Sequence, residues 1–229
     1  MSSHSAQTAT SLVISSTMTK MRHFSRFWRL LPLASVLLTA CTLTEQATTP
    51  GTGSVNDPQW QTHQQQLSHL SQYQTRGSFA YISPENKTYA KFFWQQYTPQ
   101  NYRLMLTNPI GTRELELAVE PDLATLTTKD GKTHLSDVPS ELIYQLTGME
   151  IPINDLTPWL IGLPGRATHY TLDENHLLKS ITFTQNGVTW QLDYLAYDTQ
   201  TQPSLPSRLE LSQGEQRIKL KMDSWTLNK

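Results

Sequence analysis

The chain has 229 residues, of which 37% are hydrophobic and 16% charged, and its formal net charge is -1. This length is sufficient for one domain with a substantial core. Proteins that bind nucleic acid are usually strongly basic, so this charge argues against a nucleic-acid partner. The single cysteine, Cys41, excludes a disulfide within the chain and the cysteine-rich metal sites.

Residues 1–40 have the pattern of a bacterial secretory signal. Arg22, Arg26 and Arg29 form a basic region, which is followed by an apolar run at residues 30–38. That run is too short for a comfortable membrane-spanning helix. Met18 and Met21 lie closer to the basic region than Met1 does, so residues 1–20 are expected to be an extension or the result of a misassigned start.

The sequence LTAC, which ends at Cys41, looks like a lipobox. In signals of that kind the cysteine becomes the first residue of the mature protein and carries lipid, which predicts lipidation of Cys41. The alternative is an ordinary cleaved signal followed by a buried thiol. Thr42, and not Asp, follows the cysteine, which favours the outer membrane in bacteria that sort lipoproteins by this residue.

Residues 42–57 contain five Thr, two Gly and one Pro and are expected to form a flexible tether. A single domain is then expected over residues 58–229. Asp57 and Pro58 read as an N-cap followed by proline at the first helical position. Trp60 and Leu67 recur at helical spacing, which predicts one amphipathic helix over residues 59–73.

After Arg76 the hydrophobic period becomes two, which predicts about ten antiparallel strands. Hairpins are expected at residues 77–97, at 101–120, around Asp130-Gly131, around Asn186-Gly187, and at 208–222. The strand at residues 87–97 is apolar on both faces. Phe92 and Trp94 are assigned to the inward face because Lys91 lies on the opposite one. Two short helices are expected between the halves, the second capped by Asn154 or Asp155.

The turn at residues 106–112, LTNPIGT, carries an unexpected residue at its tip. Asn108, Pro109 and Gly111 occupy the positions that a type I turn favours, whereas Ile110 is a β-branched hydrocarbon in a place that normally faces water. Ile110 is therefore expected either to be covered or to touch an apolar partner outside this chain.

No constellation of residues in the sequence calls for catalysis. The chain has no glycine-rich phosphate loop, no His-Glu-x-x-His sequence and no Gly-x-Ser-x-Gly elbow, so no enzyme activity, metal or cofactor is expected. The segment at residues 147–165 is unusually apolar for a connection. It is interpreted either as a lid that simply covers the sheet or as a lid that covers a ligand and moves, with Gly148, Gly162 and Gly165 as the flexible points.

The inward side chains are large, so the curved sheet either encloses a ligand cavity or has an ordinary filled interior. The residues alone leave these two alternatives open. The side chains expected to line such a cavity are Phe79, Tyr81, Phe92, Trp94, Tyr102, Leu104, Leu106, Leu115, Leu117, Leu146, Trp159, Ile181, Phe183 and Trp190.

The segments YRLMLTNPIGTRELEL, LTGMEIP, WLIGLPG and QRIKLKMDSW, in this order behind a lipobox, resemble the LolB family of outer-membrane lipoprotein receptors. The resemblance covers essentially the whole mature chain. It implies a half-closed antiparallel β-barrel, mainly β in class, with a lid of short α-helices over a hydrophobic acyl-chain cavity, as in the related carrier LolA.

The resemblance also implies a function. The protein would be lipid-anchored on the periplasmic side of the outer membrane, as a monomer, would accept acylated lipoproteins from a LolA-like carrier, and would insert them into the inner leaflet without using ATP. In the family an exposed apolar residue, usually Leu, stands at the turn position of Ile110 and takes part in delivery to outer-membrane lipid. The rival reading is an outer-membrane lipoprotein that binds other lipids or serves as an interaction subunit in envelope assembly.

Overall fold

The computed structural model describes residues 56–228, so the predicted signal, Cys41 and nearly all of the predicted tether lie outside the described residues. The described part contains three helices and eleven strands. Their bounds are α1 (Pro58–Ser68), β1 (Tyr73–Ile82), β2 (Lys87–Thr98), β3 (Asn101–Thr107), β4 (Arg113–Glu120), β5 (Leu123–Thr128), β6 (Thr133–Ser136), α2 (Pro139–Thr147), α3 (Ile153–Leu160), β7 (His169–Leu172), β8 (Leu178–Gln185), β9 (Val188–Asp198), β10 (Leu205–Gln213) and β11 (Gln216–Leu227).

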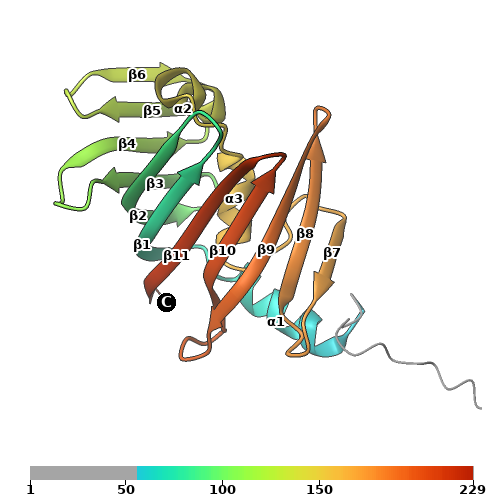
Figure 1. Ribbon diagram of the computed structural model, residues 1–229. Coiled ribbons are helices and arrows are strands. Elements are labelled where there is room, and N and C mark those ends of the chain that lie inside the picture. Colours follow the sequence, from blue (N-terminus) through green and yellow to red (C-terminus); the bar gives the residue numbers. More distant parts are fainter. Residues whose placement is uncertain (1–55, 229) are drawn as a thin grey trace, which may run out of the picture. The chain divides into compact units, whose positions relative to one another are not determined.

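All eleven strands form one antiparallel sheet in the order β6-β5-β4-β3-β2-β1-β11-β10-β9-β8-β7. Each half is an up-and-down meander, and the halves join where β1 pairs with β11. The edge strands β6 and β7 do not pair with each other, so the sheet stays open. Figure 1 shows α3 behind β10 and β11, while α2 contacts β5 and β6. The expected half-closed barrel with a helical lid is confirmed.

Strand β7 was not among the predicted strands. It spans only four residues and pairs with β8 alone, at one edge of the sheet. Its one fully buried side chain is Leu172, so the segment has almost no alternation from which a strand is recognised. The strand forms because β8 offers it a hydrogen-bonding edge, and that edge exists only after the sheet is assembled.

Helix α1 is shorter than predicted, because it ends at Ser68. Its start is as expected: the Asp57 side chain accepts hydrogen bonds from the backbone N–H groups of Gln59 at 2.7 Å and Trp60 at 3.4 Å. The chain enters β1 at Tyr73, before Arg76, because Tyr73 pairs with β2 and β11 together. The glutamine-rich residues 59–73 contain too few regularly spaced apolar side chains to show where the helix ends and the strand begins.

The backbones of β1 and β11 approach closely at Gly77. The register between these strands shifts between Arg76 and Gly77, which marks a bulge. A Cβ atom at position 77 would lie 1.8 Å from the carbonyl oxygen of Lys221. Only glycine therefore allows the two halves of the sheet to join at this point.

Candidate functional site

The turn between β3 and β4 is held by Asn108 and Gly111. The Gly111 N–H donates to the Asn108 carbonyl at 2.9 Å, and the Asn108 side-chain oxygen accepts from the Thr112 N–H at 2.9 Å. Asn108 also donates from Nδ2 to Glu114 at 3.1 Å. Gly111 has a φ of 90°, a value that favours glycine. These bonds fix the turn without using the side chain at its tip.

Ile110, at that tip, is 88% exposed. The sequence left two possibilities for this side chain, cover by the chain itself or contact with an apolar partner. No part of residues 56–228 covers it. A β-branched side chain on a hydrogen-bonded turn loses little conformational entropy when it contacts an apolar phase. The geometry therefore presents a hydrocarbon outward on a rigid support.

The side chains that were expected to line a cavity lie together in one continuous core. Thirteen of the fourteen are buried, and Leu146 is partly buried and packs against the same cluster. Trp94 and Tyr102 stack with their ring centres 4.6 Å apart. In this conformation these side chains pack against one another and against the helices, so acyl chains can enter only where this packing opens.

The lid, defined as residues 139–165 with α2 and α3, covers this core. Helix α3 buries Ile153, Leu156, Trp159 and Leu160. The expected cap by Asn154 or Asp155 is wrong, because α3 begins at Ile153 with Pro152 in the cap position and no side-chain cap bond.

Two buried tyrosines fasten the C-terminal end of α3 to the sheet. The Tyr73 hydroxyl of β1 donates to the Thr157 carbonyl at 3.2 Å, and the Tyr194 hydroxyl of β9 donates to the Trp159 carbonyl at 3.0 Å. These carbonyls belong to the last turn of α3, where intrahelical partners are missing. Burial raises the pKa of both phenols, so both hydroxyls stay protonated and able to donate.

Asp155 instead forms an ion pair with Arg166, just beyond the lid. Arg166 donates from Nε to Oδ1 at 3.0 Å and from an Nη nitrogen to Oδ2 at 2.9 Å. The Arg166 guanidinium also lies 5.4 Å from the centre of the Phe183 ring and donates to Gln185. Asp155 is only 4% exposed, so Arg166 compensates a buried charge and joins α3 to β8.

Arg166→Ala is expected to lower the free energy of unfolding by about 2 kcal/mol, because it leaves the buried Asp155 carboxylate without its partner. The value is below the range for fully buried pairs, since the Arg166 side chain is 60% exposed and solvent screens the charge. Urea unfolding measures the change. Lys132→Ala, which removes an ion pair between two exposed side chains, is the control and should change little. Equal losses in the two variants would contradict this role for Arg166.

A groove of about 540 Å³, here called the lid groove, opens between α2, α3 and the β8–β9 hairpin. Phe183 and Trp190 of the predicted set line it, together with Ile151 and Ile153 of the lid. Tyr144 and Val188 stand on opposite sides of the groove, 52% and 37% exposed. Its size suits a hydrocarbon ligand, and its walls combine these apolar side chains with polar and acidic side chains of α2, α3 and the β8–β9 turn.

The predicted set did not contain the rim of this groove. Tyr144 lies on the outward face of α2, and Val188 follows the Asn186-Gly187 turn, so neither looked inward in the periodic pattern. Tyr81, in contrast, lines a different, more polar pocket beside Glu150 and Gln216. The only sequence signal for Tyr144 and Val188 was that each places a large nonpolar group at an outward position, where the periodic pattern predicts a polar residue.

Glycines flank both lid helices. Gly148 ends α2 in the left-handed conformation with a φ of 70°, and Gly162 follows α3 with a φ of 87°. These bends allow the helices to fold back on the sheet. They also place conformationally free residues at the positions about which the lid would move.

Residues 56–228 were also searched for membrane-spanning helices and for metal sites. None of the helices in this range combines the length and apolarity needed to cross a bilayer. Nor does this range place three or more His, Cys, Asp or Glu side chains where they would hold a metal ion.

Comparison with solved structures supports the fold. A LolA superfamily protein from Nitrosomonas europaea superposes with a TM-score of 0.52 at 11% sequence identity, covering 74% of this chain and 93% of that one. At that identity the likeness concerns the fold alone.

Comparison of sequences is more specific. The family model described as "Outer membrane lipoprotein LolB" matches residues 71–225. The chain is 60% identical over 200 residues to an outer-membrane lipoprotein LolB of Photorhabdus laumondii, covering 87% of this chain and 95% of that protein. It is 56% identical over 204 residues to that of Yersinia enterocolitica, covering 88% and 96%. The lid, the open sheet and the exposed turn described above therefore belong to a member of the LolB family of outer-membrane lipoproteins.

Proposed function

We propose that this chain accepts lipoproteins from a LolA-like periplasmic carrier, holds their acyl chains under the lid, and inserts them into the inner leaflet of the outer membrane. Membership of the LolB family supports a role in lipoprotein localisation at that membrane. The observation that carries the cargo step is the lid groove, an opening between the lid and the sheet that is lined in part by apolar side chains. Ile110 carries the delivery step, because it extends from a fixed turn into solvent.

The physics of acyl chains restricts how the transfer proceeds. Each CH₂ group exposed to water costs about 0.8 kcal/mol, so release of several long chains into the periplasm would cost tens of kcal/mol. Cargo must therefore move from one apolar site into the next. If each acceptor binds the chains more tightly than the last, the transfer needs no ATP hydrolysis by this chain.

Opening the lid is part of the proposal. The core is filled by its own side chains, so acyl chains enter only when α2 and α3 move outward. The interactions that must break are the two tyrosine bonds to α3 and the ion pair of Asp155 with Arg166. An acyl chain that takes the place of the lid covers the apolar face of the sheet again, which keeps the open and closed states close in free energy.

The anchor and the exposed turn have different tasks in this proposal. Residues 1–40 act as the signal, lipidated Cys41 anchors the protein, and residues 42–57 form the tether of a single, monomeric domain at 58–229. Burial of the Ile110 side chain contributes only about 1.5 to 3 kcal/mol. Such a contact forms and breaks repeatedly, while the lipids on Cys41 keep the domain at the membrane. The chain has no catalytic role and no cofactor in this scheme.

The cargo step is tested by the double variant Tyr144→Glu/Val188→Glu. Charged side chains on both sides of the lid groove would meet the entering acyl chain and would have to be desolvated, so acceptance of lipoprotein from the carrier is expected to slow by about tenfold or more. Both positions are partly or largely exposed, so the free energy of unfolding should change little. Acceptance is measured as transfer of a labelled lipoprotein from carrier to receptor.

The matched control is Leu123→Glu/Leu135→Glu, which changes two exposed apolar side chains outside the groove. Wild-type acceptance by the groove variant would contradict the site. Mass spectrometry of material retained on gentle purification separates the rival function, because a receptor for other lipids would carry free lipid and a lipoprotein receptor would carry lipoprotein.

A further inference from the structure

The charges of the described residues are distributed very unevenly over the sheet. Residues 56–228 contain 13 Lys and Arg and 18 Asp and Glu, so this part of the chain is acidic. The four central strands, β2, β1, β11 and β10, nevertheless contain seven of the basic residues and only two of the acidic ones, Glu210 and Asp223. The seven, here called the basic face, are Arg76, Lys87, Lys91, Arg208, Arg217, Lys219 and Lys221.

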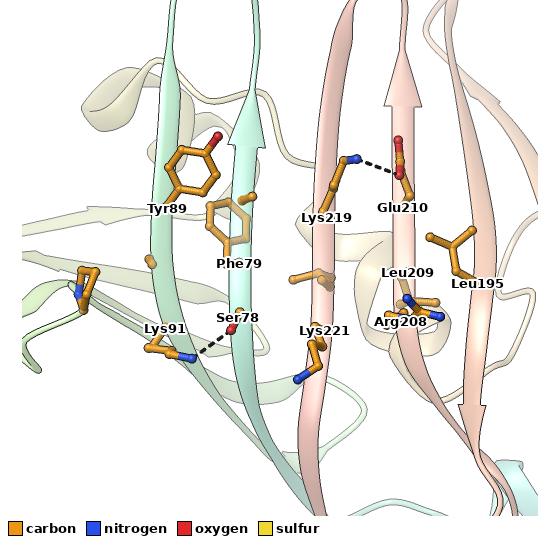
Figure 2. Close-up of a pocket in the computed structure, with 14 residues that line it drawn as sticks. Ser78, Phe79, Tyr89, Lys91, Leu195, Arg208, Leu209, Glu210, Lys219 and Lys221 are labelled. Atoms are coloured by element: carbon orange, nitrogen blue, oxygen red, sulfur yellow. Dashed lines mark hydrogen bonds and ion pairs between the residues drawn. The ribbon is translucent and has the colours of Figure 1, made fainter.

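Strand pairing brings these residues together on the side opposite the lid. Lys91 and Lys221 both stand opposite Ser78, one from each neighbouring strand. The alternating residues of these strands, including Phe79 and Leu220, are buried in the core, so the basic side chains point away from it. Figure 2 shows the lysines in front of the central strands, with Lys91 beside Ser78 and Lys219 beside Glu210.

The two acidic residues do not neutralise this face. Glu210 pairs with Lys219 at 3.2 Å, and Asp223 pairs with Lys221 at 2.6 Å. Lys91 donates to the neutral Ser78 hydroxyl at 3.0 Å. The pKa of Asp223 is lowered first by the hydrogen bond from Lys221, and also by the charges of Lys91 and Arg76. Its carboxyl thus lies in the field of cations on three strands.

Exposed apolar groups accompany the charges. A groove of about 490 Å³ on this face is lined by Lys91, Lys219 and Lys221 and also by Tyr89 and Leu195, which are 61% and 52% exposed. Pro109 lines the same groove. The basic face is therefore continuous with the turn that carries Ile110.

We propose that the basic face is a docking surface for anionic phospholipid headgroups, which sets the orientation of the domain on the membrane and brings Ile110 to the bilayer. This inference rests on the proposed function, because it explains how the delivery step is aimed. An anionic bilayer is a flat surface, and basic side chains spread over four strands fit it better than they fit a small ligand. The apolar Tyr89 and Ile110 beside the charges match the hydrocarbon boundary below the headgroups.

The tether makes such orientation useful. A tether of residues 42–57 would restrain the distance of the domain from the membrane without fixing which side faces it. Each basic residue near an anionic surface strengthens binding about fivefold at physiological salt, and the attraction extends over roughly 8 to 10 Å. Several lysines on one side of an otherwise acidic domain therefore select one orientation and repel the others.

The test uses the mature chain with Cys41→Ala, so that binding to vesicles does not depend on the lipid anchor. Sedimentation with phosphatidylcholine vesicles, with and without about 30% phosphatidylglycerol, measures binding at low and high salt. We expect at least about tenfold stronger binding with phosphatidylglycerol, abolished at high salt. Adding Lys91→Glu/Lys221→Glu should weaken binding to the anionic vesicles by about 25-fold or more, because two attractive charges become repulsive.

The matched control is Lys129→Glu/Lys179→Glu, which changes the net charge equally at exposed positions outside the central strands. Equal weakening by both double variants would show a net-charge effect only and overturn the proposal. So would equal binding to vesicles with and without phosphatidylglycerol, or unchanged binding by Lys91→Glu/Lys221→Glu.

Cargo acceptance from the carrier, measured in solution on the same variants, separates this inference from the proposed function. Normal acceptance with weakened vesicle binding supports the docking surface. Loss of acceptance with unchanged vesicle binding would assign the basic face to the carrier and overturn the membrane proposal. Failure of acceptance in the wild-type chain itself would instead contradict the proposed function.

Discussion

Replacing Ile110 with Glu is expected to slow delivery of lipoprotein into membranes by about tenfold to 100-fold, with folding and cargo uptake unchanged. Burial of the Ile side chain contributes about 1.5 to 3 kcal/mol, and a carboxylate in its place adds a cost when it approaches hydrocarbon. Stability should not change, because Ile110 is 88% exposed and the turn is held by Asn108 and Gly111. Transfer of labelled lipoprotein from the loaded receptor to liposomes measures the rate.

Two controls define what this result means. Ile110→Leu preserves the hydrocarbon and should deliver at nearly the wild-type rate. Leu123→Glu places the same charge at an exposed position beside the turn at the other end of β4 and should also be close to wild type. Delivery by Ile110→Glu at the wild-type rate would exclude the proposed role of the tip.

Gly77→Ala is expected to lower the free energy of unfolding by about 3 kcal/mol or more. The added Cβ would lie 1.8 Å from the Lys221 carbonyl oxygen, which is backbone and cannot rotate away. The clash falls where β1 and β11 join the two meanders, so relief of the strain requires the halves of the sheet to separate. Denaturant unfolding followed by circular dichroism measures the change.

Gly214→Ala is the matched control for this variant. Gly214 has a φ of 55° but no heavy atom within 4 Å of its Cβ position, so alanine there meets only the left-handed backbone penalty of about 1 to 2 kcal/mol. A cost at Gly77 no larger than at Gly214 would show that the sheet adjusts to the added methyl group.

Much of the sheet was predictable because its signals are local. Tyr102, Leu104 and Leu106 recur at every second position, and this period of two places all three on the same, buried face of the strand. The Asn186-Gly187 turn likewise fixes the β8–β9 hairpin within a few residues. In contrast, the start of β1 at Tyr73 and the edge strand β7 depend on partners elsewhere in the sheet, so the sequence pattern missed both.

The candidate site divides in the same way. The apolar tip Ile110 was visible in the sequence, because a hydrocarbon at that turn position contradicts the turn chemistry around it. Asp155 was wrongly predicted to be a helix cap, because an acidic residue near the start of a helix often has that role. Its actual partner, Arg166, lies 11 positions along the chain, outside the helix that the pattern describes. The rim residues Tyr144 and Val188 became recognisable only when the lid was placed beside the β8–β9 hairpin.

The amino-acid sequence by itself determined the class of the fold, the inward set of side chains, the turn at residues 108–111 and the resemblance to the LolB family. Each of these depends on the pattern of residues within short segments of the chain. The tertiary structure alone decided where grooves open and where charge gathers. Lys91 and Lys221 are 130 positions apart and flank one residue, Ser78, only after β1 has paired with β2 and β11. Pairing between distant strands is set by the packing of the whole sheet, so the basic face exists in the folded protein and not in any segment of the chain.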